Sequence, residues 1–256
     1  MDKKLVSFIV GGDPSPEYTV KFMEGLSEYS DIIELGIPFS DPMADGETIQ
    51  KADLRALNSG MTVSKIFEII KNFKEKRTTP IVVMTYYNPV YQMGVENFIK
   101  KLKDCGGDGL IIVDLPVEES EGYVNLCNKY GIKTIFLSAP NTSEERLKLI
   151  DKYSNMFVYL VSLYGTTGSR DEISEKAIEF LKRAKKICKN PVYVGFGISK
   201  KEHAKKFIEN GADGIVVGSA YVKIIEEYGK SEETINKLRE KAKELKEGIL
   251  EGCKNI

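Results

Sequence analysis

Several features that mark other classes of protein are missing from this chain. Lys and Arg total 37 against 38 for Asp and Glu, so the 256 residues carry a formal net charge of −1. This balance argues against a nucleic-acid-binding or membrane-surface protein, whose field would be basic. No apolar run approaches the roughly 18 residues of a membrane span. Linkers and low-complexity segments are also missing, so we expect one domain over residues 1–256.

Metal-ligating residues are equally sparse. The single histidine is His203, and the four cysteines, Cys105, Cys127, Cys188 and Cys253, are scattered without a CxxC pair. Such a set cannot form a zinc site at any usual spacing, so we expect free thiols in a reducing compartment. The apolar run of the N-terminus MDKKLVSFIVGGDPS is shorter than that of a signal peptide and ends without a small-residue cleavage site. We therefore expect a cytoplasmic protein.

What the chain does contain is a regular alternation of short apolar runs with longer amphipathic patterns. The runs are rich in Ile, Val and Leu with little polar alternation, which is typical of parallel strands buried on both faces. Eight such units over about 250 residues match a (β/α)8 TIM barrel, whereas a doubly wound sheet usually has fewer strands. The expected strands are Leu5–Val10, Asp31–Leu35, Pro80–Thr85, Gly109–Val113, Lys133–Leu137, Phe157–Val161, Val192–Gly195 and Gly214–Val217.

The intervening segments carry apolar stripes at helical spacing. Ser231 is a plausible N-cap for the last helix, because Glu232 and Glu233 follow it. The other expected helices are Glu17–Ser27, Val63–Lys74, Glu118–Tyr130, Ser143–Tyr153, Ser174–Cys188 and Lys200–Asn210.

The active site of such a barrel lies at the C-terminal ends of the strands, so the residues directly after each strand are the candidates. The turns after the last three expected strands are rich in glycine. Backbone N–H groups that converge there, at a helix N-terminus, bind phosphate. The expected phosphate donors are Gly168, Gly197, Gly218 and Ser219.

Carboxylates gather on the opposite side of the expected barrel mouth, in the stretch ELGIPFSDPMADGETIQ from Glu34 to Gln50. Strand alternation puts Ile32 and Glu34 on one face. If that face points inward, desolvation raises the pKa of Glu34 toward the range useful for proton transfer. Asp45 could be a helix N-cap or a functional acid, and Asp114 could belong to a turn or to the site.

Aromatic residues near the mouth suggest a ligand with a flat ring and a phosphate tail. Nothing in the sequence indicates a metal, so the phosphate would be a binding handle rather than the reacting group. The aromatic residues are Phe8, Tyr86, Tyr87, Tyr91, Tyr159 and Phe196.

These motifs together resemble the α subunit of tryptophan synthase. The resemblance rests on ELGIPFSDPMADG with TIQ, MTYYNPVY, DGLIIVDLP, LYGTTG, GFGIS and GADGIVVGSA, in the family's order and spacing. It implies a lyase of tryptophan biosynthesis that cleaves indole-3-glycerol phosphate to indole and glyceraldehyde 3-phosphate. Glu34 would be the general acid and base, and Asp45 would hold the indole N–H. Phe8, Tyr86, Asp114, Tyr159 and Phe196 would form the indole pocket.

The resemblance also implies an α2β2 complex in which indole passes to a β subunit. Pyridoxal phosphate belongs to that subunit, so no cofactor is expected on this chain. The turn Pro38–Pro42 and the LYGTTG loop would communicate with the partner. The chain departs from the family pattern at Glu47, where proline is usual, at Leu163 and Tyr164, and in an N-terminal helix that is shortened or absent.

Two other functions remain open at this point. One is a different phosphate-binding barrel, such as an isomerase or a thiamine-phosphate-type synthase, which would lack the Glu34 and Asp45 pair and would often need Mg²⁺. The other is a regulatory subunit that binds a phosphosugar and activates a β partner without useful turnover of its own.

Overall fold

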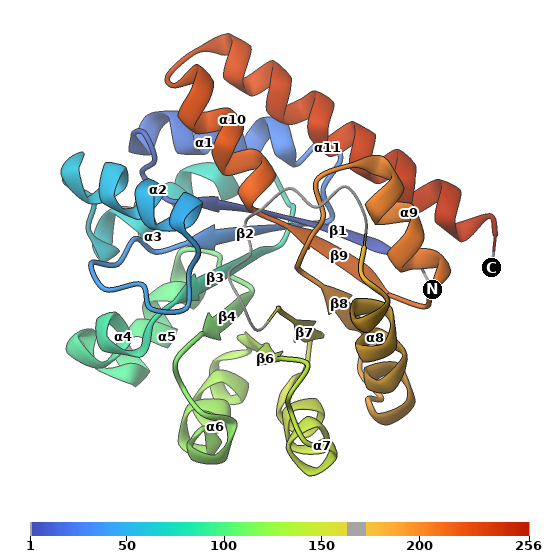
Figure 1. Cartoon of the computed structure of the whole chain (residues 1–256). Coiled ribbons are helices and arrows are strands. Elements are labelled where there is room, and N and C mark those ends of the chain that lie inside the picture. Colours follow the sequence, from blue (N-terminus) through green and yellow to red (C-terminus); the bar gives the residue numbers. More distant parts are fainter. Residues whose placement is uncertain (1, 163–172, 256) are drawn as a thin grey trace.

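The computed structural model describes residues 2–162 and 173–255. Its strands are all parallel and follow the order β5-β4-β3-β2-β1-β9-β8-β7-β6. They lie at the centre of the molecule with the helices around them (Figure 1). The strands are β1 (Lys4–Val10), β2 (Ile32–Gly36), β3 (Ile81–Thr85), β4 (Gly109–Ile112), β5 (Lys133–Thr134), β6 (Phe136–Ser138), β7 (Val158–Leu160), β8 (Val192–Val194) and β9 (Gly214–Val217).

The fold is the expected TIM barrel with one correction. The fifth expected strand is divided at Ile135 into β5, which pairs with β4, and β6, which pairs with β7. Side chains replace ladder partners there, because the N–H of Thr134 donates to Asn155 Oδ1 at 2.8 Å and that of Phe136 to Ser154 Oγ at 3.2 Å. The barrel therefore closes through the chain itself between the two outermost strands.

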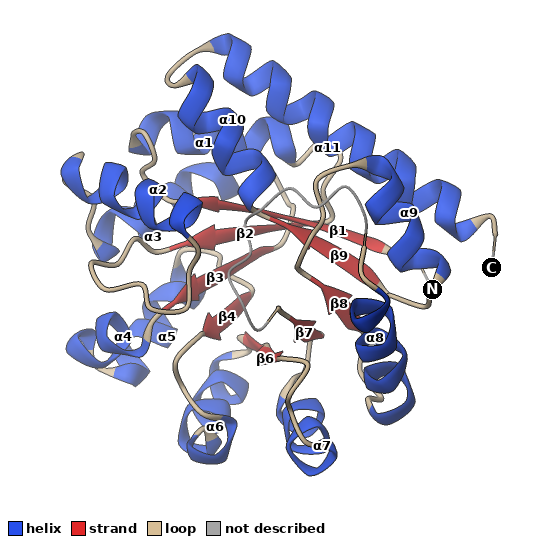
Figure 2. Cartoon of the chain, in the orientation of Figure 1, coloured by secondary structure: helices blue, strands red, loops and turns tan. Residues whose placement is uncertain are grey.

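Helices cover the outside of the barrel (Figure 2). They are α1 (Pro16–Leu26), α2 (Glu47–Asn58), α3 (Val63–Lys74), α4 (Tyr87–Met93), α5 (Val95–Asp104), the 3₁₀ turn η1 (Val117–Glu119), α6 (Glu121–Tyr130), α7 (Glu144–Tyr153), α8 (Glu175–Ile187), α9 (Lys201–Glu209), α10 (Ser219–Tyr228) and α11 (Glu232–Cys253). The expected helix Glu118–Tyr130 starts later, at Glu121, since a 3₁₀ turn precedes it. None of the helices in the described ranges is both long and apolar enough to span a membrane.

Capping residues set where several helices begin. Ser231 is the N-cap of α11 as expected, and its hydroxyl accepts the N–H of Thr234 at 3.2 Å. Ser15, Ser143 and Ser174 accept the equivalent N–H groups of α1, α7 and α8. Each such bond satisfies one of the donors that the first turn of a helix leaves without an intrahelical partner.

Two apolar layers follow from the alternation of side chains along the strands. The larger layer lies between strands and helices. The smaller one fills the barrel interior and takes residues from around the barrel: Val6, Ile32, Val82, Ile111, Ile135, Phe157, Tyr159, Tyr193 and Val216. Because side chains alternate, a residue two positions beyond an interior residue points into the barrel mouth. Glu34 follows Ile32 in this way.

Ion pairs line the opposite, N-terminal end of the strands. Asp31 accepts the ammonium groups of Lys4 at 3.3 Å and Lys246 at 2.6 Å, which ties α11 to the barrel. Asp213 pairs with Lys3 at 3.1 Å and with Lys185. Within the described residues the first element is β1, and no helix precedes it.

Candidate active site

Glu34 is a fully buried carboxyl at the C-terminal end of β2. Its side chain is 0% exposed, and neither carboxyl oxygen has a hydrogen-bond partner among the residues that the structure describes. Desolvation, and then the negative charge of Asp45, raise its pKa to about 8. The face shared by Ile32 and Glu34 therefore points inward, which was the condition for the raised pKa, and the group holds its proton at neutral pH.

Tyr159 lies next to Glu34 inside the barrel. Burial raises the pKa of its hydroxyl, and the charges of Glu34 and Asp45 raise it further. Gly195 directly follows β8. A side chain at this position would overlap the Tyr159 ring, so the glycine leaves room for the ring. Tyr159, an expected residue of the ring pocket, is therefore a neighbour of Glu34.

Asp45 is held by a tyrosine from a different part of the chain. Tyr86 Oη donates to Asp45 Oδ2 at 2.6 Å and accepts the N–H of Ala44 at 3.0 Å. Burial raises the pKa of Asp45, and the Tyr86 hydrogen bond opposes this shift. The N-cap of α2 is Gly46, which makes no side-chain capping bond. Of the two alternatives for Asp45, helix capping is therefore wrong.

A small cavity beside Asp45 gathers part of the expected ring pocket. It is lined by Phe8, Gly36, Ile37, Asp45, Ile49, Asp53, Met84, Thr85 and Tyr86. Phe8 is the strand neighbour of Glu34, so the cavity lies next to both acids. Its volume of about 10 Å³ is far below the usual few hundred Å³ of a ligand pocket. A ring can enter only if a lining segment moves.

The expected phosphate donors lie at the start of α10 and in the turn after β8. Gly218 is the N-cap of α10, Ser219 is its first residue, and the first turn carries no acid. Gly197 has φ +68°, a conformation that favours glycine. The N–H groups of a first helical turn have no intrahelical acceptor and attract anions. Gly168, with the LYGTTG motif, lies outside the described residues.

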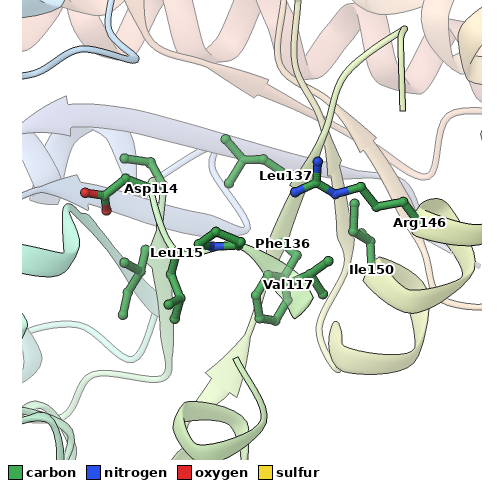
Figure 3. Close-up of a pocket in the computed structure, with 10 residues that line it drawn as sticks. Asp114, Leu115, Val117, Phe136, Leu137, Arg146 and Ile150 are labelled. Carbon is green, nitrogen blue, oxygen red and sulfur yellow. The ribbon is translucent and has the colours of Figure 1, made fainter. Parts of the chain in front are cut away.

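The structure places Asp114 at a second cavity. This cavity, of about 170 Å³, lies at the ends of β4 and β6, with Asp114 and Arg146 on opposite sides of Phe136 (Figure 3). Asp114 is exposed, and its Oδ1 accepts the N–H of Tyr87, the first residue of α4, at 2.6 Å. Of the two alternatives left open, this contact favours the turn.

Phe196 is half-buried and packs edge-on against Phe207 of α9, with ring centroids 5.8 Å apart. This contact orients the turn after β8 that also contains Gly197. Both residues therefore lie at the mouth of the barrel, on the side expected for phosphate.

One buried acid of this site was not predicted. Asp53 of α2 is 5% exposed and lines the same cavity as Asp45. A signal was present, since Asp53 lies four residues after Ile49 on the otherwise apolar face of α2. Within the described ranges, no group of three or more His, Cys, Asp or Glu side chains is arranged to hold a metal ion.

Comparisons with known proteins agree on one family. Residues 1–250 match the family described as "Tryptophan synthase alpha chain". The tryptophan synthase alpha chain of Methanococcus vannielii is 56% identical, covering 97% of this chain and 96% of its own length. That of Pyrococcus abyssi is 54% identical, covering 95% and 98%. A solved structure from the tryptophan synthase α2β2 complex of Pyrococcus furiosus is 51% identical, with a TM-score of 0.91 over 96% of this chain and 99% of that one.

Proposed function

The chain belongs to the family of tryptophan synthase alpha chains, and we propose that the Asp45 cavity is its active site. The reaction is the lyase step of tryptophan synthesis, in which indole-3-glycerol phosphate is cleaved to indole and glyceraldehyde 3-phosphate. The observation that carries this assignment is the pair of acids. Glu34 is buried, has no hydrogen-bond partner among the described residues and is neutral, whereas Asp45 is hydrogen-bonded by Tyr86.

Glu34 is the proposed acid and base. With a pKa of about 8, it holds a proton at neutral pH and can give it to C3 of the indole ring. The resulting carboxylate takes the proton of the glycerol hydroxyl on the carbon next to the ring. The carbon–carbon bond to C3 then breaks, its electron pair restores the aromatic ring, and the alcohol becomes the aldehyde. Glu34 ends the cycle protonated, as it began.

Asp45 is the proposed counter-charge. Tyr86 occupies Oδ2, so Oδ1 is the oxygen proposed to accept the indole N–H. Protonation at C3 places positive charge on the ring nitrogen, and a carboxylate there stabilises it. The two acids have different environments, as a division between proton donor and charge stabiliser requires.

The start of α10 is the proposed phosphate site. Gly218 and Ser219 supply first-turn N–H groups, and the turn at Gly197 lies after the neighbouring strand β8. Gly168 is proposed as a further contact from the sequence resemblance. An anion held by backbone donors needs no cation. We therefore propose that the reaction requires neither metal nor cofactor on this chain.

A β subunit is the proposed partner, in an α2β2 complex. The proposal is supported by the related Pyrococcus furiosus chain, which comes from work on mutual activation in such a complex. Pyridoxal phosphate would be bound by the β subunit. The turn Pro38–Pro42, which precedes Asp45, and the LYGTTG loop are the proposed communicating segments. The proposed location is the cytoplasm, which the four free thiols support.

The test is release of indole from indole-3-glycerol phosphate by the purified chain in EDTA, with and without a β subunit. We expect release in both cases and a faster rate with β. Absence of indole release both without and with the β subunit would contradict the assignment. A requirement for Mg²⁺ would favour a different phosphate-binding barrel, and turnover only with β would favour a regulatory subunit.

A further inference from the structure

Arg55 is a partly buried cation near the barrel mouth to which the mechanism above gives no role. It lies in the last turn of α2, and its guanidinium donates from Nε and Nη2 to the two carboxylate oxygens of Asp13, each at 2.8 Å. Its Nη1 donates to Glu226 Oε1 at 3.2 Å. One side chain thus joins the loop after β1, the helix α2 and the helix α10.

The contact between Arg55 and Asp13 is firmly held. The Asp13 side chain is 0% exposed, and two parallel N–H···O bonds match the planar guanidinium to the carboxylate. If Arg55 moved away, Asp13 would be left as an unpaired charge out of water, which is strongly unfavourable. Ser59, four residues after Arg55, donates to the carbonyl oxygen of Gly12 at 3.3 Å. The end of α2 is therefore fixed to the loop after β1.

The start of α2 carries the ring end of the proposed site. Asp45 directly precedes the N-cap of this helix, and Gln50 Nε2 donates to the backbone oxygen of Asp45 at 2.8 Å. Ile49 of the same helix lines the cavity beside Asp45. A shift of α2 therefore shifts Asp45.

The start of α10 carries the phosphate end of the proposed site. Gly218 is the N-cap, and a Cβ there would lie 3.0 Å from Phe8 Cδ1, so this turn packs closely on β1. Phe8 also lines the Asp45 cavity. Glu226 lies near the end of the same helix, about two turns after Ser219. The helices α2 and α10 are also in direct contact.

We propose that Arg55 is a positioning residue: by holding the ends of α2 and α10 together, it sets the distance between Asp45 and the phosphate site. The inference rests on the proposed function, in which one substrate spans both places. The ring and the phosphate of such a substrate bind together only when the two ends of the site match its length. Arg55 therefore contributes to binding of the whole substrate and not to binding of either part alone.

The first test compares one joined ligand with its two parts. The probes are indole, glycerol 3-phosphate and indole-3-propanol phosphate, which joins the ring to the phosphate through three carbons and lacks the hydroxyl needed for cleavage. Titration calorimetry measures the Kd of each. In Arg55→Met the joined ligand should bind at least about tenfold more weakly, because only a matched spacing makes the second contact intramolecular. The Kd of each part should change by less than about twofold.

Two milder variants decide the question if Arg55→Met does not fold. Arg55→Lys keeps a cation beside Asp13, but an ammonium lacks the fork that reaches Asp13 and Glu226 together. Glu226→Gln keeps the buried pair of Arg55 and Asp13 and removes only the charge on α10. Each should weaken binding of the joined ligand about two- to fivefold, the effect of one partly exposed ion pair. Arg239→Met breaks the pair of Arg239 with Glu28 at 2.8 Å, between α11 and the turn after α1. It is the matched control and should bind all three probes as the wild type does.

The second test needs no ligand. Hydrogen exchange followed by mass spectrometry should be faster in the peptides that cover α2 and α10 in Arg55→Met, and unchanged there in Arg239→Met. Unchanged exchange in both Arg55→Met and Glu226→Gln would overturn the inference, whatever the probes do. A joined ligand that loses no affinity, or loses no more than its parts, would overturn it as well. A wild type that binds none of the probes, together with the expected change in exchange, would instead count against the proposed function alone.

Discussion

At the scale of single residues, the fold keeps the Glu34 carboxyl neutral, and this lowers the folding stability of the protein at alkaline pH. The pKa of Glu34 rises from the ordinary 4.5 to about 8 on folding. The folded state therefore binds the proton more tightly than the unfolded state, and folding stability falls as the pH rises through this window. The loss is on the order of a few kcal/mol above pH 8.

Replacing Glu34 by glutamine removes this ionisation, so Glu34→Gln should be more stable than the wild type at alkaline pH. The difference in melting temperature should grow from about pH 5 to about pH 9, across the two pKa values. Thermal unfolding by circular dichroism measures it, with exposed Glu121→Gln as control. If the difference in melting temperature between Glu34→Gln and the wild type does not change with pH, the surroundings of Glu34 do not disfavour its charged form.

Tyr86 supplies a second prediction at this scale. Tyr86→Phe removes the donor to Asp45 Oδ2 and the acceptor for Ala44 N–H while it keeps the ring that stacks on Phe39. A hydrogen bond to a charged group contributes about 1.5–3 kcal/mol, so kcat/KM for indole release should fall about 10- to 100-fold. Steady-state kinetics checks this. Tyr91→Phe, at a residue that is 64% exposed, should stay at the wild-type value.

The sequence allowed one acid of the pair to be placed and not the other. Alternation along one strand was enough to place Glu34 on the same face as Ile32, because both belong to the same local pattern, and the folded barrel turns that face inward. Asp45 depends on a hydroxyl that is 41 residues away, and only the folded barrel brings these two segments together. Asp53 was overlooked because its apolar neighbours on α2 made the face look like ordinary core.

At the scale of elements, the N-terminus of α10 is where helix stability and ligand binding make opposite demands. Ser219→Asp adds a negative charge at the positive end of the helix, which should stabilise the fold by about 0.3–1 kcal/mol. The same charge repels a phosphate bound there, so KM for indole-3-glycerol phosphate should rise about tenfold or more.

Thermal unfolding and steady-state kinetics on the Ser219→Asp protein separate the two effects. Ser143→Asp makes the same change at the N-cap of α7 and should leave KM at its wild-type value. An unchanged KM for Ser219→Asp would place the phosphate elsewhere.

Elements differed in how well the sequence predicted them. The strands were predicted from apolar runs, because a short run of Ile, Val and Leu without polar alternation is typical of a parallel strand buried on both faces. The fifth was divided because Asn155 and Ser154 take its backbone donors, a contact that no local pattern shows. The helices α4, α5 and α10 were not among those predicted from the sequence. Pro89 lies inside the first turn of α4, where proline is tolerated but resembles a helix break.

At the scale of the whole molecule, the two ends of the barrel differ in the charged groups they carry: the C-terminal end holds the site, and the N-terminal end holds stabilising ion pairs. The C-terminal end carries Glu34, which has no hydrogen-bond partner among the described residues, near the negative charge of Asp45, whereas ion pairs of Asp31 and Asp213 connect segments at the N-terminal end. Burial raises the pKa of Asp213, but Lys185, the Val192 N–H and Lys3 outweigh it and hold the pKa below the ordinary value. This stability is present above the ordinary carboxyl pKa and is lost as the pH falls.

Asp213→Asn should therefore destabilise the protein by about 1–3 kcal/mol near neutral pH, because Lys3 and Lys185 lose their carboxylate. The difference from the wild type should shrink below about pH 4, where the wild-type carboxyl begins to take up a proton. Urea unfolding at two pH values measures both. Asp104→Asn, at an exposed position of α5, serves as the control, and an equal loss at both pH values would argue against the ion pairs.

The central claim is that Glu34 and Asp45 together perform the cleavage. The most direct measurement is indole release by Glu34→Gln and by Asp45→Asn beside the wild type, each checked for folding by circular dichroism. Loss of a positioned proton donor lowers a rate by about 10²–10⁴-fold, and we predict at least this for Glu34→Gln. Asp45→Asn should show a comparable loss, with Glu121→Gln and Asp104→Asn at the wild-type rate. Folded variants at either position that release indole as fast as the wild type would contradict the account.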